Sequence, residues 1–151
     1  MEVNFSVLGE PKGKARPKTV KLKNGASHTY TPDGTVLYEN LIATEYRRQI
    51  GDVSFPDKEM LEMRVIAYFT IPGSASKKTK MLMEDREIRP TKKPDMDNIV
   101  KVVADALNKV AFRDDSQIVE CRISKYYSTQ PRIEVTILSA KTERSIKLLW
   151  D

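Results

Sequence analysis

The sequence is poor in the residues that most often form disulfides or bind transition metals. It contains one cysteine, Cys121, and one histidine, His28. A single cysteine excludes an internal disulfide. One cysteine and one histidine are also too few for the usual zinc site, which needs about four such ligands. No apolar run approaches the roughly twenty residues of a membrane-spanning helix. We therefore expect a cytoplasmic protein in which Cys121 is buried on the inward face of a strand.

Acidic residues are absent from one long stretch near the N-terminus. Residues 11–31 carry five lysines and one arginine but no acid, whereas the whole chain has 26 basic and 21 acidic residues. Pro and Gly interrupt this stretch, and Asn24-Gly25 is typical of a tight hairpin turn, so we expect a weakly paired basic loop. Clustered charge suits a phosphate backbone. We expect phosphate contacts from this loop and from a second basic segment, through Lys12, Lys14, Arg16, Lys18, Lys92 and Lys93.

Periodic hydrophobicity predicts the helices and strands. Alternating apolar residues predict strands over 3–7, 60–71, 117–127 and 132–138, with the last two joined as a hairpin at "STQP". Helical spacing predicts helices over 35–50, 76–86 and 97–110. The expected caps are Thr35 for the first helix and Ser74 or Ser76 for the second. The apolar positions of the first helix are Leu37, Leu41, Ile42 and Tyr46.

This order of elements predicts one α+β domain. We expect residues 1–139 to form a mixed β-sheet flanked by helices. Residues 140–151 form a C-terminal tail that we expect to be helical and packed on the core.

The segment "PDMDNIVK" places paired acids in front of an amphipathic helix. Asp95 and Asp97 are separated by one residue, and alternate side chains of an extended segment point the same way. Two carboxylates on one side suit Mg²⁺, which prefers oxygen ligands. Lys101 follows Asp97 by one helical turn. Asp114 and Asp115 end the connection after the helix, where a neighbouring strand can bring a carboxylate back to the pair.

Each of these features also has a simpler explanation. Asp97 can cap the helix and interact with its dipole. Lys101 can form only a weak i, i+4 ion pair with Asp97, and Asp114 and Asp115 can form a solvated turn. Together, however, three or four acids and a lysine amid basic segments are the inventory of a magnesium nuclease.

The segment "KKPDMDNIVKVVADALNKVAFRDDSQIVECRISKYY" closely resembles the signature of the RusA family of Holliday-junction resolvases, which are endodeoxyribonucleases of bacteria and their prophages. The resemblance extends more loosely from the first strand to about Leu138. It implies a RusA-like fold and four catalytic residues. These are Asp95, Asp97 and Asp115, which also bind the metal, and Lys101.

The same resemblance implies the cofactor, the substrate and the assembly. The cofactor is Mg²⁺, for which Mn²⁺ can substitute, and the substrate is branched DNA, especially four-way junctions. Paired cuts across one junction require two active sites, and hence a homodimer. Asp114 and Asn98 are expected to support the carboxylates, with Asn98 as a second candidate cap. Asp105 lies too far along the helix for the metal, so we expect it to form a structural ion pair or hydrogen bond.

Two other functions remain open at this stage. The same carboxylates could serve a metal-dependent nuclease for flaps, replication forks or other branched DNA. Alternatively, the chain could be a non-catalytic DNA-binding module of the same fold. Against this second alternative, all four catalytic positions of the family are intact.

Overall fold

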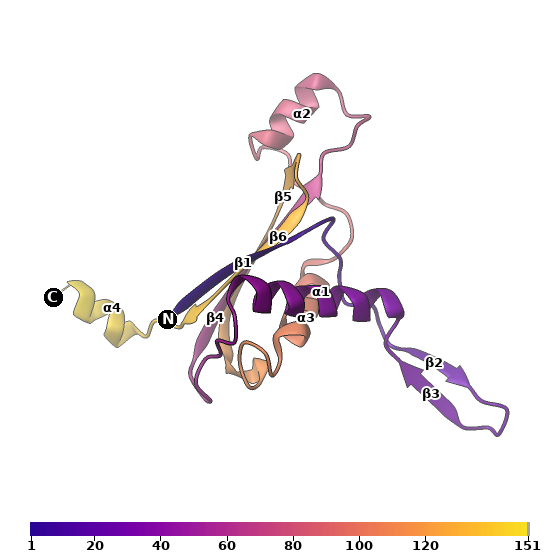
Figure 1. Cartoon of the computed structure of the whole chain (residues 1–151). Coiled ribbons are helices and arrows are strands. Elements are labelled where there is room, and N and C mark those ends of the chain that lie inside the picture. Colours follow the sequence, from indigo (N-terminus) through magenta and orange to yellow (C-terminus); the bar gives the residue numbers. More distant parts are fainter. Residues whose placement is uncertain (151) are drawn as a thin grey trace.

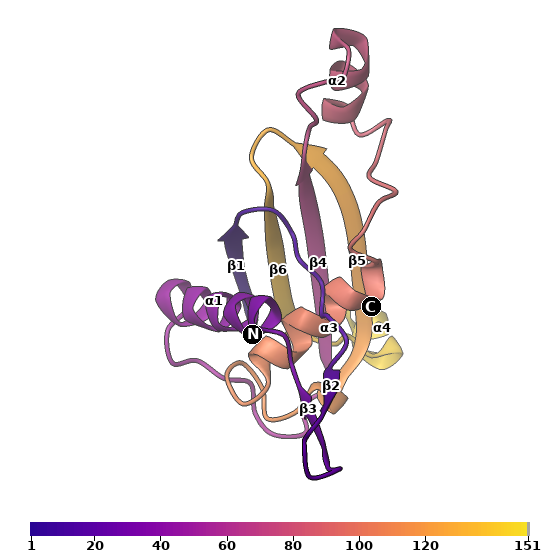
Figure 2. The same ribbon diagram turned by 90° about the vertical axis from the view of Figure 1, so that its right-hand side faces the viewer.

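A four-stranded mixed sheet forms the centre of the computed structural model, which describes residues 1–150 apart from the side chains of 143 and 145 (Figures 1 and 2). The strand order is β1-β6-β4-β5. β4 pairs in parallel with β5 and antiparallel with β6, and β6 pairs antiparallel with β1. The expected α+β fold with a mixed sheet is confirmed. The strands are β1 (Glu2–Leu8), β4 (Leu61–Thr70), β5 (Ile118–Ser128) and β6 (Arg132–Ser139).

The predicted hairpin between the last two strands is wrong. β4 lies between β5 and β6, so these consecutive strands do not pair with each other (Figure 2). β4 is the most apolar strand, and seven of its ten residues are buried. Such a strand suits the centre of the sheet, where a neighbouring strand lies along each of its edges. The connecting segment, Thr129 to Pro131, also lacks the Gly or Asn that a tight two-residue hairpin turn prefers.

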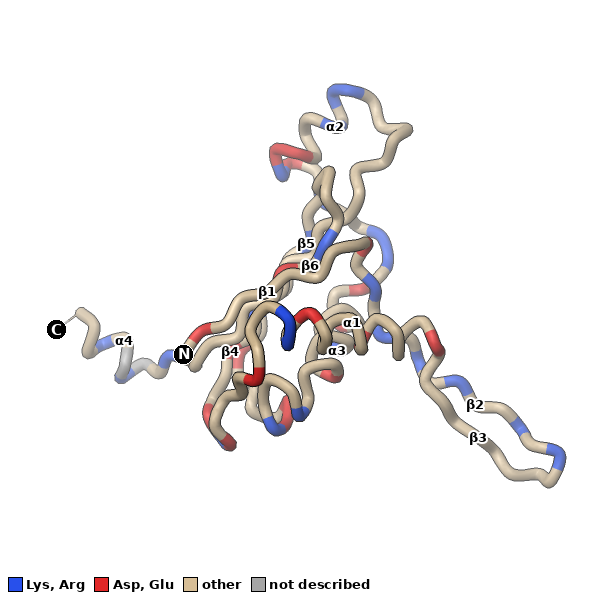
Figure 3. The backbone as a smooth tube through the Cα atoms, in the orientation of Figure 1, with Lys and Arg blue, Asp and Glu red and all other residues tan. Residues whose placement is uncertain are grey.

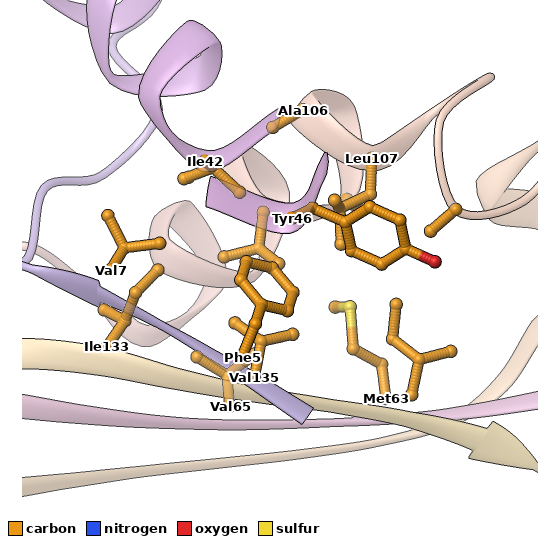
Figure 4. Close-up of a cluster of buried hydrophobic side chains, with 14 of the residues drawn as sticks. Phe5, Val7, Ile42, Tyr46, Met63, Val65, Ala106, Leu107, Ile133 and Val135 are labelled. Atoms are coloured by element: carbon orange, nitrogen blue, oxygen red, sulfur yellow. The ribbon is translucent and has the colours of Figure 1, made fainter. Parts of the chain in front are cut away.

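Two helices cover one face of this sheet and form the core with it. They are α1 (Asp33–Gln49) and α3 (Met96–Leu107). Figure 4 shows side chains of the two helices meeting those of the strands, with Phe5 against Tyr46. Their rings meet edge to face at 5.4 Å between centroids, a favourable aromatic geometry. The Tyr46 hydroxyl donates a hydrogen bond to the Val53 carbonyl, which satisfies its polar group at the edge of the core.

The helix starts agree only in part with the predicted caps. Ser76 caps α2 (Lys77–Glu84) as expected, accepting a hydrogen bond from the Thr79 amide at 3.2 Å. Thr35 does not cap α1, because the helix begins two residues earlier, after Pro32. Thr35 is buried instead, and its hydroxyl accepts a hydrogen bond from the Ala15 amide. Of the four apolar positions predicted for α1, two are buried and two are exposed, namely Leu37 and Leu41.

Two further elements project from the body. The hairpin of β2 (Lys18–Lys21) and β3 (Ser27–Tyr30) occupies the basic stretch, and α4 (Glu143–Trp150) extends from the end of β6 (Figure 1). The expected packing of the tail on the core is wrong, since Leu149 and Trp150 are exposed. A hydrogen bond from Ala140 to the Met60 carbonyl holds only the start of the tail, and the helix then leads away from the sheet. Within residues 1–150, none of the helices combines the length and apolar character needed to cross a bilayer.

Candidate active site

The acidic motif lies at the start of α3. Asp95 is the N-cap residue, and its side chain makes no capping hydrogen bond. The simpler explanation of Asp97 as the cap is therefore wrong, and so is that of Asn98, which lies inside the helix. Both acids are exposed. Their carboxylates thus remain available for a ligand, in a position where the positive end of the helix dipole favours negative charge.

Asp95 and Asp97 do not point the same way, because α3 begins between them. Asp95 keeps an extended backbone, with φ −67° and ψ 151°, whereas Asp97 lies in the first helical turn. Successive residues of a helix are rotated by about 100° around its axis, so the alternation of an extended chain no longer applies. As a result the two carboxylates line different grooves on either side of the helix start.

The first of these, the α3 groove, combines three of the four expected catalytic residues. It has a volume of about 530 Å³. Asp97 and Lys101 contribute from one face of α3, and Asp115 contributes from the short 3₁₀ helix η1 (Asp115–Gln117). The Asn108 side chain, at the end of α3, accepts a hydrogen bond of 2.9 Å from the Asp115 amide. Asn108 thus fixes η1 against the helix, a positioning role that sequence reasoning missed.

Asp114 has a structural role of its own. Its carboxylate caps η1 by accepting a hydrogen bond from the Ser116 amide, and Gln117 completes a capping box. Hydrogen bonds from Ser116 hold the pKa of Asp114 below its ordinary value. Asp114 does not line the α3 groove. The turn it stabilises nevertheless presents Asp115 to that groove.

The second groove, which we call the stalk groove, runs between α3 and residues 11–17, the stalk that leads to the β2-β3 hairpin. It has a volume of about 540 Å³ and includes Asp95 and Asn98. The stalk approaches α3 closely at Gly13, where an added Cβ would lie 2.9 Å from the Cβ atoms of Asn98 and Pro94. The Lys14 amide donates a 2.8 Å hydrogen bond to the Asn98 carbonyl. The basic residues lining this groove are Lys12, Lys14, Arg16 and Lys93.

Lys14 differs from the other basic residues of the stalk, because acids of the protein surround its ammonium. Its ammonium pairs with Glu39 at 2.5 Å and with Asp105 at 3.3 Å, and only 15% of its side chain is exposed. Burial alone would lower the pKa of Lys14, but the hydrogen bonds to Glu39 and Asp105 raise it above the ordinary value. Two acids of the protein therefore engage the ammonium that was expected to contact phosphate. The structural ion pair expected for Asp105 is confirmed, with Lys14 as its partner.

A second residue that sequence reasoning missed is Lys125 on β5. Its ammonium donates hydrogen bonds to the Lys92 carbonyl at 2.6 Å and the Pro94 carbonyl at 3.1 Å. It also lies 5.0 Å from the centroid of the Phe69 ring. Burial lowers the pKa of Lys125, the charge of Asp95 opposes this shift, and Lys92 adds to it. Lys125 therefore ties the loop that leads into Asp95 to the edge of the sheet.

Replacing Lys125 with methionine is expected to slow DNA cleavage by about 10- to 100-fold, the usual cost of losing a residue that orients a ligand. It should also raise the Mg²⁺ concentration needed for half-maximal cleavage, because Asp95 loses its support. Titrations of cleavage against Mg²⁺ measure both quantities. Lys141→Met makes the same charge change at an exposed site in the tail. An equal loss in both variants would show that Lys125 acts only through net charge.

Cys121 also lines the α3 groove, which corrects the expectation that it is buried. It pairs with Met63 of β4, and Met63 is fully buried. Cys121, however, lies on the edge strand, next to the open groove. The pairing between β4 and β5 shifts register at Leu61 and Glu62, and Val119 beside this irregularity is 59% exposed.

The donor chemistry of the α3 groove fits Mg²⁺, although three carboxylates are not gathered in one place. Among the described residues, no group of three or more His, Cys, Asp or Glu side chains is placed to hold a metal ion. Asp97 and Asp115 nevertheless line one groove. Mg²⁺ usually takes one or two protein carboxylates and completes its octahedron with water and phosphate oxygens. This pair can therefore hold Mg²⁺ together with a phosphate, while Asp95 lies on the other side of the helix start.

Comparisons with known proteins agree with the motif. The family model described as Endodeoxyribonuclease RusA matches residues 9–138, which include both grooves and the hairpin. The chain is also 39% identical to the uncharacterized protein YqaN of Bacillus subtilis (strain 168). That alignment extends over 143 residues and covers 89% of this chain and 94% of the relative.

Proposed function

Since the chain belongs to the RusA family of endodeoxyribonucleases, which indicates a nuclease of the Holliday-junction resolvase type, we propose that it cuts four-way DNA junctions by paired, magnesium-dependent hydrolysis of phosphodiester bonds. The observation that carries the proposal is the meeting of Asp97, Lys101 and Asp115 in one groove. Two carboxylates and an ammonium group beside each other can bind a metal and the phosphate on which it acts.

The roles follow from the charges in and beside the α3 groove. Asp97 and Asp115 would hold Mg²⁺ in the α3 groove, and Asp95, on the other side of the start of α3, would add its negative charge to the site. When bound, Mg²⁺ supplies an activated water and offsets negative charge on the phosphate. The Lys101 ammonium stabilises the further charge that develops as the phosphate is attacked. No hydrogen bond or ion pair within the described residues engages the side chain of Lys101, so its charge is available for this role.

The DNA backbone is proposed to approach along the basic side of the site. Lys12, Arg16 and Lys93 line the stalk groove next to Asp95, and Lys18 and Lys92 are exposed nearby in the sequence. Figure 3 shows basic residues, in blue, along the β2-β3 hairpin and the segments that lead to it and to α3. Such contacts position DNA through its phosphates and do not read its bases. A similar protein occurs in B. subtilis, so we propose that the enzyme is bacterial and acts in the cytoplasm, where bacterial DNA lies.

Paired cutting further implies a homodimer. One chain carries one candidate site, whereas two symmetrical nicks in a junction need two sites related by a twofold axis. Light scattering should then give twice the mass of the 17.2 kDa chain. A monomer that still makes paired nicks would contradict this part of the proposal.

The test of the function is cleavage of a synthetic four-way junction beside a linear duplex and a flap. We expect paired nicks in the junction with Mg²⁺ and none with EDTA, and we also expect Mn²⁺ to support cutting. Cleavage of the flap in preference to the junction would keep the chemistry but change the substrate. Binding without cleavage of any substrate would indicate a non-catalytic module.

Cys121 provides a chemical test of whether DNA lies in the α3 groove. It is the only cysteine, and it is exposed beside Asp97 and Asp115. We expect junction DNA to slow its reaction with a maleimide, because the backbone covers the thiol. Burial raises the pKa of Cys121, so labelling should be compared at a fixed, mildly alkaline pH. An unchanged labelling rate at saturating DNA would show that the DNA takes another path, and Cys121→Ser is the blank for background labelling.

A further inference from the structure

Within residues 1–150, the β2-β3 hairpin, residues 18–30, is a two-stranded ribbon that forms a sheet of its own. It extends away from the sheet and helices (Figure 1), and every residue of both strands is exposed. Its turn follows the expected Asn24-Gly25 pattern. Gly25 has a positive φ of 85°, and the Asn24 side chain accepts a hydrogen bond from the Ala26 amide. Because an isolated hairpin is only marginally stable in water, a ribbon like this one benefits from a partner.

The two faces of the ribbon differ in chemistry. The strand register pairs Lys18 with Tyr30 and Val20 with His28, and side chains that face each other across a pair share one side of the ribbon. The rings of His28 and Tyr30 stack on that side, with centroids 6.0 Å apart and planes inclined by 13°. Val20 extends this side as an exposed apolar residue. We call this side, formed by Val20, His28 and Tyr30, the aromatic face.

The opposite face is polar and holds the ribbon together. Thr19 pairs with Thr29, and their hydroxyl oxygens lie 3.0 Å apart, within hydrogen-bonding distance. Lys21 pairs with Ser27 on the same side. The apolar and stacking surfaces are therefore concentrated on one side only.

The charge of the ribbon and its attachment indicate what covers the aromatic face. The ribbon contains Lys18, Lys21 and Lys23 and no acid, so a polyanion is the partner that its charge complements. The stalk is fastened to the start of α3 by the hydrogen bond from Lys14 to the Asn98 carbonyl and by the close approach of Gly13. A polyanion bound at the candidate active site thus lies within reach of the ribbon.

We propose that the aromatic face stacks on DNA bases that are unpaired at the branch point of the substrate. A continuous duplex presents phosphates and the edges of stacked base pairs, which suit lysine and threonine. Only unstacked bases expose flat apolar surfaces that match aromatic and aliphatic side chains. The ribbon thereby contributes selectivity for branched over linear DNA, which the phosphate contacts of the stalk cannot supply. This inference rests on the proposed function.

The test compares two double variants in the Asp97→Asn background, so that the DNA stays intact during binding. His28→Ala with Tyr30→Ala removes the rings, and Thr19→Ala with Thr29→Ala is the matched control on the other face of the same strands. The probe is a four-way junction with 2-aminopurine at the branch point, beside a linear duplex. Affinity and 2-aminopurine fluorescence are measured with both DNAs.

We expect loss of the rings to weaken junction binding by at least about tenfold and duplex binding much less. It should also abolish the fluorescence change at the branch point, and His28→Phe with Tyr30→Phe should restore that change. Equal effects of the ring and threonine variants on junction binding, or a fluorescence change that survives without the rings, would overturn the inference while leaving the proposed function intact. Absence of junction cleavage by the protein with Asp97 and both rings intact would instead contradict the proposed function, and this inference with it.

Discussion

Replacing Asp97 with asparagine is expected to reduce junction cleavage by at least about 10²-fold while junction binding stays equal or becomes tighter. Asp97 lies in the α3 groove with Lys101 and Asp115, and no hydrogen bond or ion pair of the described chain engages its carboxylate. Asparagine keeps the shape of the side chain but removes the charge that attracts Mg²⁺. The same change removes repulsion between the carboxylate and the DNA phosphates, so affinity should not fall.

Cleavage rates and junction affinity of this variant should be measured together. Asp52→Asn is the matched control, since Asp52 is an exposed acid in the loop between α1 and β4 that lines neither groove. A stability change within about 0.5 kcal/mol is expected for both variants, as for other surface substitutions. If Asp97→Asn lost binding together with cleavage, Asp97 would be a structural residue, and the α3 groove would no longer be the candidate active site.

The parts of the fold that were predictable are those set by local periodicity. The predicted helix over 97–110 corresponds to α3, in which Ile99, Val103 and Leu107 recur at helical spacing and are buried. The Ser76 cap and the turn at Asn24-Gly25 depend on single residue types with strong local preferences, and both were foreseen. The meeting of Asp97 and Lys101 also follows from spacing alone, because residues four apart share one face of a helix.

The parts that failed depend on tertiary partners that no local pattern shows. The position of β4 between β5 and β6 results from which strand is most completely buried, which is a property of the whole sheet. The divergence of Asp95 and Asp97 depends on the exact residue at which α3 begins. Helix boundaries are uncertain by a residue or two in any reading of a sequence, and here one residue decides which groove a carboxylate enters.

The ion pairs of the stalk were not predictable for a related reason, since a sequence does not show which of several lysines meets an acid. Lys12 and Lys14 look equivalent in the sequence, yet Lys12 is exposed and Lys14 contacts Glu39 and Asp105. The sequence likewise did not predict the role of Lys125, because its hydrogen-bond partners are carbonyl groups more than thirty residues earlier in the chain.

Lys12→Met and Lys14→Met make the same chemical change but are expected to affect different properties. Lys14→Met should lower stability, and Lys12→Met should weaken DNA binding. Lys14→Met leaves two partly buried acids, Glu39 and Asp105, without their cation, and should lower the free energy of unfolding by about 1–3 kcal/mol. Folding raises the pKa of Lys14, so this contribution is fully present below the ordinary pKa of 10.5 and is lost only as the pH rises above that value. Denaturant unfolding at neutral pH measures the loss.

Lys12→Met should instead leave stability unchanged within about 0.5 kcal/mol and weaken binding to junction and duplex alike. The slope of log affinity against log salt should become shallower by about one for the phosphate contact that is lost. Lys14→Met should leave this slope unchanged, because an ammonium paired with two acids contributes no phosphate contact. A shallower slope for Lys14→Met without loss of stability would show that DNA displaces Glu39 and Asp105 from Lys14, and that the stalk rearranges when DNA binds.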